Sequence, residues 1–86
     1  MRVNLLETDI DLTKLRYGIE TFEMINGECP KYVVMNEQTR HVIESKCIPF
    51  YIENGIYFSS VLHADSIFGI PIAYSNSLSF GIVDIV

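Results

Sequence analysis

The sequence predicts an α+β fold, with two helices packed on a mixed or antiparallel sheet of four to six strands. Three observations support this class. Residues 12–26 repeat apolar side chains at helical spacing, residues 31–35 form a short apolar run, and residues 67–86 have the pattern of strand, polar turn and strand. The chain has 86 residues and shows neither internal repeats nor a linker, so we expect a single domain over residues 1–86.

The composition suits a small core and limits the function classes. Apolar residues make up 49% of the chain, which is too rich for disorder, yet no apolar run approaches the roughly 20 residues of a membrane span. The net charge of −5 repels phosphate and argues against general nucleic-acid binding. The apolar stretch near residue 1 is too short for a signal peptide, so we expect a cytoplasmic protein with free thiols at Cys29 and Cys47.

Residues 12–26 have the clearest helical pattern. Apolar side chains recur at alternating spacings of three and four residues, at Leu12, Leu15, Ile19 and Phe22. This spacing places them on one face of a helix. Carboxylates in residues 9–11 are suited to cap its start, and Gly27 followed by Pro30 is typical of its end. Residues 1–8 are predicted to form either a short strand or an arm.

The next two segments predict a strand and a second helix. Residues 31–35 are apolar throughout their centre, which is typical of a strand buried on both faces and therefore central in its sheet. Asn36 is placed to cap a helix over residues 37–46, with an acidic residue in the first turn and a lysine in the last. Pro49 is expected to end this region.

Residues 50–59 have the pattern of a β-hairpin closed by Asn54-Gly55. Asn-Gly favours positive φ at both central positions, as a type I′ turn requires. The register places three bulky side chains on each face, with Phe50, Ile52 and Tyr57 on one and Tyr51, Ile56 and Phe58 on the other. Because both faces are apolar, we expect something outside the hairpin to cover one of them.

The closing segment predicts two further strands. In the first, the bulky side chains of Phe68, Ile70, Ile72 and Tyr74 alternate with the small ones of Gly69, Pro71 and Ala73. The small side chains predict a face that a helix approaches closely, and the bulky face is the alternative. Pro71 lacks an N–H group, so its local position is expected to be an edge or a bulge. Residues 79–86 are predicted to form a strand built into the sheet.

The sequence has no pattern that points to catalysis, a metal or a cofactor. The candidate metal ligands Cys29, His41, Cys47 and His63 lack the closely spaced pair of a closed zinc site. The serines form no Gly-x-Ser-x-Gly elbow, and the scattered glycines form no phosphate-binding loop. We therefore expect a protein that is not an enzyme and that requires neither cofactor nor metal.

Two segments together resemble a known family. Residues 32–39 form a strand pattern ending in Met-Asn before a helix, and residues 68–78 form a Gly-Ile-Pro strand that runs into a Ser-Asn turn. The pair resembles part of the core domain of tailed-phage major capsid proteins and short proteins of Gram-positive phages and prophages. The chain lacks the spine helix and extended loops of a capsid subunit. The resemblance implies a small α+β unit of phage origin in the host cytoplasm, and it transfers no catalytic residue.

Protein binding is the function that the residues favour. On a helical wheel, Tyr17 and Met24 fall opposite the apolar stripe, where polar residues are expected. Tyrosine and methionine are enriched in interface cores, and the aromatic hairpin is a second apolar surface. We predict five partner-binding residues, Tyr17, Met24, Tyr51, Ile56 and Phe58. The partner implied by the resemblance is a host or phage protein, such as a host enzyme or defence system that the chain inhibits.

Two other functions stay open at this point. The chain could be a self-assembling structural module related to a capsid-like domain, which would form homo-oligomers. It could also bind a small ligand or nucleotide in a pocket formed between subunits.

Overall fold

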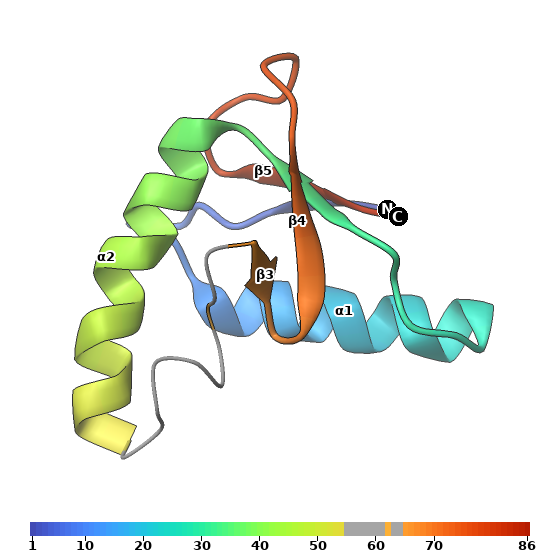
Figure 1. Ribbon diagram of the computed structural model, residues 1–86, viewed down its shortest axis with the longest axis horizontal. Coiled ribbons are helices and arrows are strands. Elements are labelled where there is room, and N and C mark those ends of the chain that lie inside the picture. The colour runs from blue at the N-terminus through green and yellow to red at the C-terminus, as the bar shows by residue number, and fades with distance from the viewer. Residues whose placement is uncertain (55–61, 63–64) are drawn as a thin grey trace.

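The structure, a computed structural model, describes residues 1–54, 62 and 65–86, and the side chains of residues 1–46, 62 and 65–86. Its elements are β1 (Arg2–Asn4), α1 (Leu12–Asn26), β2 (Val33–Met35), α2 (Glu37–Asn54), β3 (Ser66–Ile67), β4 (Ile70–Tyr74) and β5 (Ile82–Ile85). The predicted α+β class is confirmed, because two helices pack on a five-stranded mixed sheet (Figure 1).

The described strands form one sheet in the order β1-β5-β2-β4-β3. Strands β2 and β4 run parallel, and the other neighbouring pairs run antiparallel. Strand β2 occupies the centre, as predicted for residues 31–35. Strand β5 lies between β1 and β2, so the prediction that residues 79–86 enter the sheet is confirmed for Ile82–Ile85.

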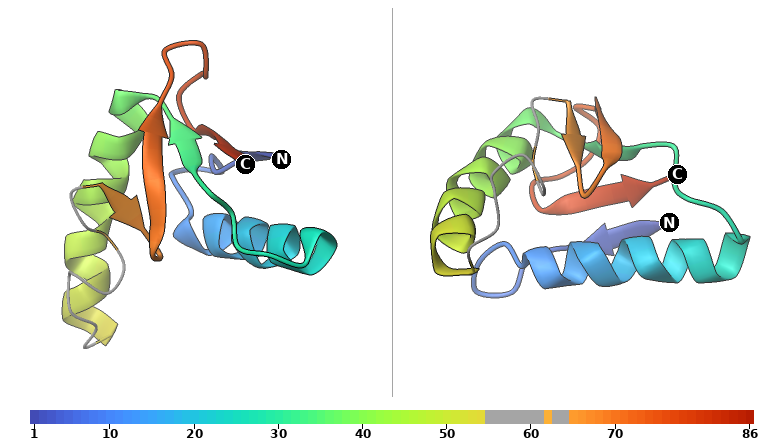
Figure 2. Two further views of the ribbon diagram at one scale, coloured as in Figure 1. Left: turned by 45° about the vertical axis from the view of Figure 1, so that its right-hand side comes forward. Right: turned by 60° about the horizontal axis from the view of Figure 1, so that its bottom comes forward.

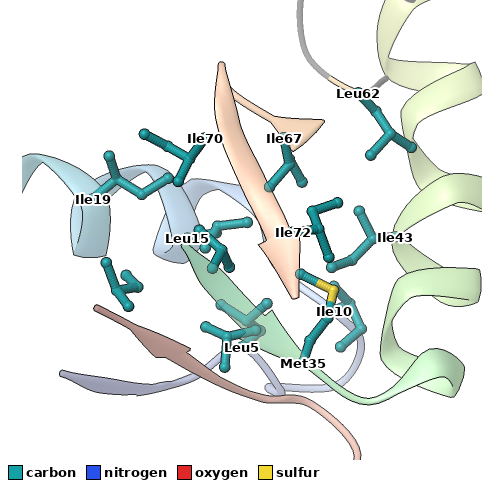
Figure 3. Close-up of a cluster of buried hydrophobic side chains, with 13 residues drawn as sticks. Leu5, Ile10, Leu15, Ile19, Met35, Ile43, Leu62, Ile67, Ile70 and Ile72 are labelled. Carbon is teal, nitrogen blue, oxygen red and sulfur yellow. The ribbon is translucent and has the colours of Figure 1, made fainter. Parts of the chain in front are cut away.

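The core lies between the helices and one face of the sheet. Helix α1 lies beneath β1 and β5, whereas α2 lies beside β3 (Figure 2). Both helices contribute to one cluster of buried apolar side chains, which Figure 3 shows around Leu15 of α1, Ile43 of α2 and Ile72 of β4. Alternate residues of β2, β4 and β5 point into this cluster, so the sheet turns a single face toward both helices.

Helix α1 begins and ends where the sequence predicts. The Asp11 carboxylate accepts a hydrogen bond from the Thr13 N–H group at 2.9 Å and so caps the first turn. Gly27 follows the helix with φ 72°, and its N–H group donates to the Glu23 carbonyl at 2.8 Å. Both ends are therefore satisfied by residues close in sequence.

The prediction of a hairpin at Asn54-Gly55 is wrong for its first strand, residues 50–53. Residues 50–53 belong to α2, which passes through Pro49 and continues to Asn54. A short apolar run suits a helix as well as a strand, and an Asn-Gly pair is also common where helices end. The second arm, residues 56–59, lies outside the described residues.

A two-residue hairpin joins β3 and β4 instead, through Phe68-Gly69. Ile67 pairs with Ile70, and φ is 50° at Phe68 and 79° at Gly69. Two successive positive φ values are typical of a type I′ turn. Phenylalanine is unfavourable at such a position because its Cβ atom crowds the backbone. Its side chain is half-buried against the core, and this burial offsets part of the strain.

The helices cover the bulky face of β4, so the prediction of a close approach over the small residues is wrong. Ile70 and Ile72 are buried, whereas Pro71 is exposed and Ala73 is half-buried. Burying isoleucine removes more apolar surface from water than burying proline or alanine does. Side-chain size therefore decides which face of β4 turns inward.

Pro71 lies in a strand with a neighbour on each side, yet its own position is a local edge on the β2 side, as the missing N–H group predicts. The Ile72 N–H group donates to the Asp65 carbonyl at 2.7 Å, on the β3 side of the strand. Because successive N–H groups alternate in direction, the nitrogen of Pro71 faces β2. Pairing with β2 starts one residue later, at Val33 and Ile72, so the missing donor lies just outside the ladder.

Candidate functional site

Large apolar side chains are exposed on the outer side of α1. The exposed fractions are 62% for Tyr17, 83% for Met24 and 72% for Ile25. Tyr17 and Met24 are the two members of the predicted site that lie in α1, and both point away from the core. Ile25 joins them although the sequence places it only at the border of the apolar stripe.

The packing of α1 sets the direction in which this patch points. A Cβ atom built on Gly18 would lie 2.9 Å from both Val3 Cγ2 and Ile85 Cδ1, so this side of the helix lies directly beneath β1 and β5. Ile19, one residue later, points toward Ile70 of β4 (Figure 3). Helix α1 therefore turns one side toward β1 and the adjoining side toward β4.

The exposed apolar side chains belong to the β1 side of the helix. At 100° per residue, a rotation from Ile19 past Gly18 reaches Ile25 next, and then Tyr17 and Met24. Because Gly18 faces β1 and β5, these side chains lie on the side of α1 beyond Gly18, away from β4.

The outer edge of β1 presents backbone groups that pair with none of the described strands. Met1 and Ile85 exchange two hydrogen bonds of 2.7 and 2.8 Å, and the Leu5 N–H group donates to the Gly81 carbonyl at 2.8 Å. In an antiparallel pair the intervening residues turn their N–H and C=O groups the other way. Arg2 thus points its backbone groups away from β5, and Asn4 does the same.

Among the described strands, none pairs with this side of β1. We call the combined surface the α1–β1 flank: the backbone edge at Arg2 and Asn4, with Tyr17, Met24 and Ile25 below it. The sequence contains no signal for the edge, because strand order is not encoded locally.

The other predicted contact residues are not brought to this surface by the described structure. Tyr51 lies in α2, with its side chain outside the described residues. Ile56 and Phe58 lie outside the described residues altogether.

A cavity of about 490 Å³ opens beside the start of α1. Its described wall combines an acidic segment with two cations and one aromatic ring, and consists of residues 7–13, Arg16, Lys46 and Phe68. Both cations have carboxylate partners, since Lys46 Nζ lies 2.5 Å from Asp9 and Arg16 lies 3.5 Å from Glu20. The hydrogen bond from Lys46, assisted by the N–H group of Ile10, lowers the pKa of Asp9.

This cavity gives no basis for a catalytic assignment. Within its described wall there is no cysteine or histidine that could serve as nucleophile or base. In the part of the chain that the structure describes, no three His, Cys, Asp or Glu side chains gather as metal ligands. Cys29 is a free, exposed thiol, and the side chain of Cys47 lies outside that part.

None of the described helices has the length and apolar character needed to span a membrane.

No family model, curated protein or solved structure matches the chain. The resemblance of residues 32–39 and 68–78 to phage proteins therefore stays a prediction, and the assignment of a function rests on the α1–β1 flank.

Proposed function

We propose that this chain is a non-enzymatic protein-binding domain and that the α1–β1 flank is its contact surface. The exposure of Tyr17, Met24 and Ile25 supports the proposal. Single exposed apolar residues are common on soluble proteins, but three within two to three turns of one helix form a patch. Tyrosine and methionine are also enriched at the centres of protein interfaces.

A host or phage protein is the partner class that we propose, with the host cytoplasm as the site of action. This step is supported by the resemblance of residues 32–39 and 68–78 to phage proteins. A small domain can act by covering a site on its partner through a contact surface of this kind. Inhibition of a host enzyme or defence protein is therefore the role that we propose for it.

Self-association is a second candidate, and a specific observation favours it. The outward backbone groups of Arg2 and Asn4, which no described strand pairs with, can bond to another strand, including β1 of a second copy.

A pair of matched double variants tests the contact surface. Tyr17→Ser with Met24→Ser removes the apolar side chains, whereas Arg16→Ser with Glu20→Ser removes two exposed charged side chains of the same helix and leaves the apolar ones in place. Tagged chains of each kind are used to capture partners from host-cell lysate, with recovery measured by quantitative mass spectrometry.

We expect the Tyr17 and Met24 variant to lower partner recovery at least about tenfold, since buried interface anchors each contribute strongly to binding. The control variant should recover the partner at the wild-type level. Thermal melts must show that both variants remain folded. Equal recovery by wild type and by the Tyr17 and Met24 variant would show that this flank is not the contact surface.

A further inference from the structure

We propose that the α1–β1 flank is occupied by a second copy of this chain, with β1 paired to β1 so that two five-stranded sheets become one continuous sheet. This inference rests on the second candidate of the proposed function, self-association, and it assigns the α1–β1 flank to a second copy in place of a host or phage protein. It is carried by the self-complementarity of the edge and by its continuity with the exposed apolar side of α1.

The backbone edge of β1 fits its own copy in one antiparallel register. The outward-facing residues are Arg2 and Asn4, with Val3 midway between them. A two-fold axis at Val3 places Arg2 of each copy opposite Asn4 of the other, and each such pair can exchange two hydrogen bonds. The two arginines do not face each other, so this register opposes no like charges.

The same axis brings the apolar patches together. Gly18 lies directly beneath Val3, so the middle of α1 lies close to the axis. New strand pairs are spaced about 4.8 Å apart, and α1 lies beneath β1 and β5, so the two copies of α1 become antiparallel neighbours. Tyr17, next to Gly18, then lies near the centre of the contact, and Met24 and Ile25 lie toward its two ends.

The helix contact is needed as well as the strand pairing. A three-residue edge strand supplies only a few hydrogen bonds, which do not by themselves offset the loss of translational and rotational freedom on association. Apolar burial between the helices supplies the remainder.

A proline substitution at the edge separates dimerisation from folding. Arg2→Pro removes an outward N–H group while the inward hydrogen bonds of Met1 and Val3 to β5 remain. Arg2→Ala is the matched control, because it removes the same charge and keeps the N–H group. Sedimentation velocity of the full chain over a concentration series measures the dimer dissociation constant, and circular dichroism at low concentration checks the fold.

We expect wild type and Arg2→Ala to dimerise and Arg2→Pro to raise the dissociation constant at least about tenfold. Tyr17→Asp should weaken the dimer by a similar factor, since it places two carboxylates near the axis. A wild-type chain that stays monomeric up to millimolar concentration would overturn the inference, and so would a dimer that tolerates Arg2→Pro.

The outcomes also separate this inference from the proposed function. A monomeric wild type that captures another protein through Tyr17 and Met24 leaves the proposed function standing and removes self-pairing. Loss of that capture in Arg2→Pro would assign the edge to a strand of the other protein, which also overturns self-pairing.

Discussion

Helices α1 and α2 begin with the same kind of cap, yet they are held in different ways. Asp11 accepts a hydrogen bond from Thr13, two residues later, and remains near the surface. Asn36 accepts one from the Thr39 N–H group at 2.7 Å, and its Nδ2 group also donates to the Leu78 carbonyl at 3.0 Å. The start of α1 is secured locally, whereas that of α2 is bound to the loop between β4 and β5.

A second bond strengthens the attachment of α2. Thr39 is fully buried, and its hydroxyl accepts a hydrogen bond from the Gly81 N–H group at 3.0 Å. Asn36, which precedes α2, and Thr39 in its first turn thus hold two points of a loop about 40 positions further along the chain. The contrast teaches that a capping residue marks where a helix starts but does not determine which other part of the chain binds to that start.

Four predictions test this contrast.

The largest effect is expected at Gly81, where the loop meets α2. Its φ is 83°, and an added Cβ atom would overlap the side chain of Leu6. Gly81→Ala should therefore lower the free energy of unfolding by about 2–4 kcal/mol, measured by urea denaturation.

Gly27→Ala is the matched control for this prediction. Gly27 also has positive φ, at 72°, but an added Cβ atom would meet no atom within 4 Å. It ends α1 in open space, so we expect a loss of only about 1 kcal/mol. Equal losses for the two variants would show that the loop is not held tightly against its surroundings.

Removing the Thr39 hydroxyl should have the next largest effect. Thr39→Val keeps the shape but leaves the buried Gly81 N–H group without its acceptor. We expect a loss of about 2 kcal/mol in the free energy of unfolding. Thr39→Ser keeps the hydroxyl and should recover part of this loss; a serine variant less stable than the valine variant would contradict the role of the hydrogen bond.

The two caps can be compared directly. Asp11→Ala should cost about 1 kcal/mol, the usual value for an N-cap residue. Asn36→Ala should cost about 1 kcal/mol more, because it also removes the hydrogen bond to Leu78. Urea denaturation of both variants under one condition measures the difference, and a smaller loss at Asn36 would refute the unequal attachment.

The smallest effect concerns the exposed ion pair between Asp9, ahead of α1, and Lys46 of α2. Because Lys46 lowers the pKa of Asp9, the native state favours the charged carboxylate. Its contribution to stability is present above the unfolded pKa of about 3.9 and is lost as pH falls through the lower folded value.

Lys46→Met should move the pKa of Asp9 upward toward its ordinary value, as carboxyl chemical shifts measured against pH would show. Lys14→Met is the control, because it removes a neighbouring cation that pairs with Glu7 instead. A titration of Asp9 that is unchanged in Lys46→Met would show that the ion pair does not form in solution.

Predictions from sequence succeeded where the determining contacts are local. The apolar spacing of α1, the carboxylate of Asp11 and the position of Gly27 act within a few residues, so the bounds of the helix follow from them. The same holds for Asn36, whose capping bond to Thr39 spans three residues. The exposure of Tyr17 and Met24 follows from the helical period alone.

Predictions failed where a short segment suits more than one structure. Residues 50–53 form a run too short to show a helical or a strand period, and α2 includes them. Phe68 has a favourable side chain for a strand, yet it occupies a turn with positive φ because the register of β3 and β4 requires it. Neither outcome is visible from the neighbours of these residues in the sequence.

The sequence by itself determined α1, the capped start of α2 and the buried segment that becomes β2. The tertiary structure alone decided the strand order, the face of β4 that the helices cover, and the position of β1 at the edge of the sheet. The physical reason is the separation along the chain between the residues that interact. Helical period and capping depend on residues three or four positions apart, whereas strand order and the free edge depend on pairing between β1 and β5, which lie at opposite ends of the chain.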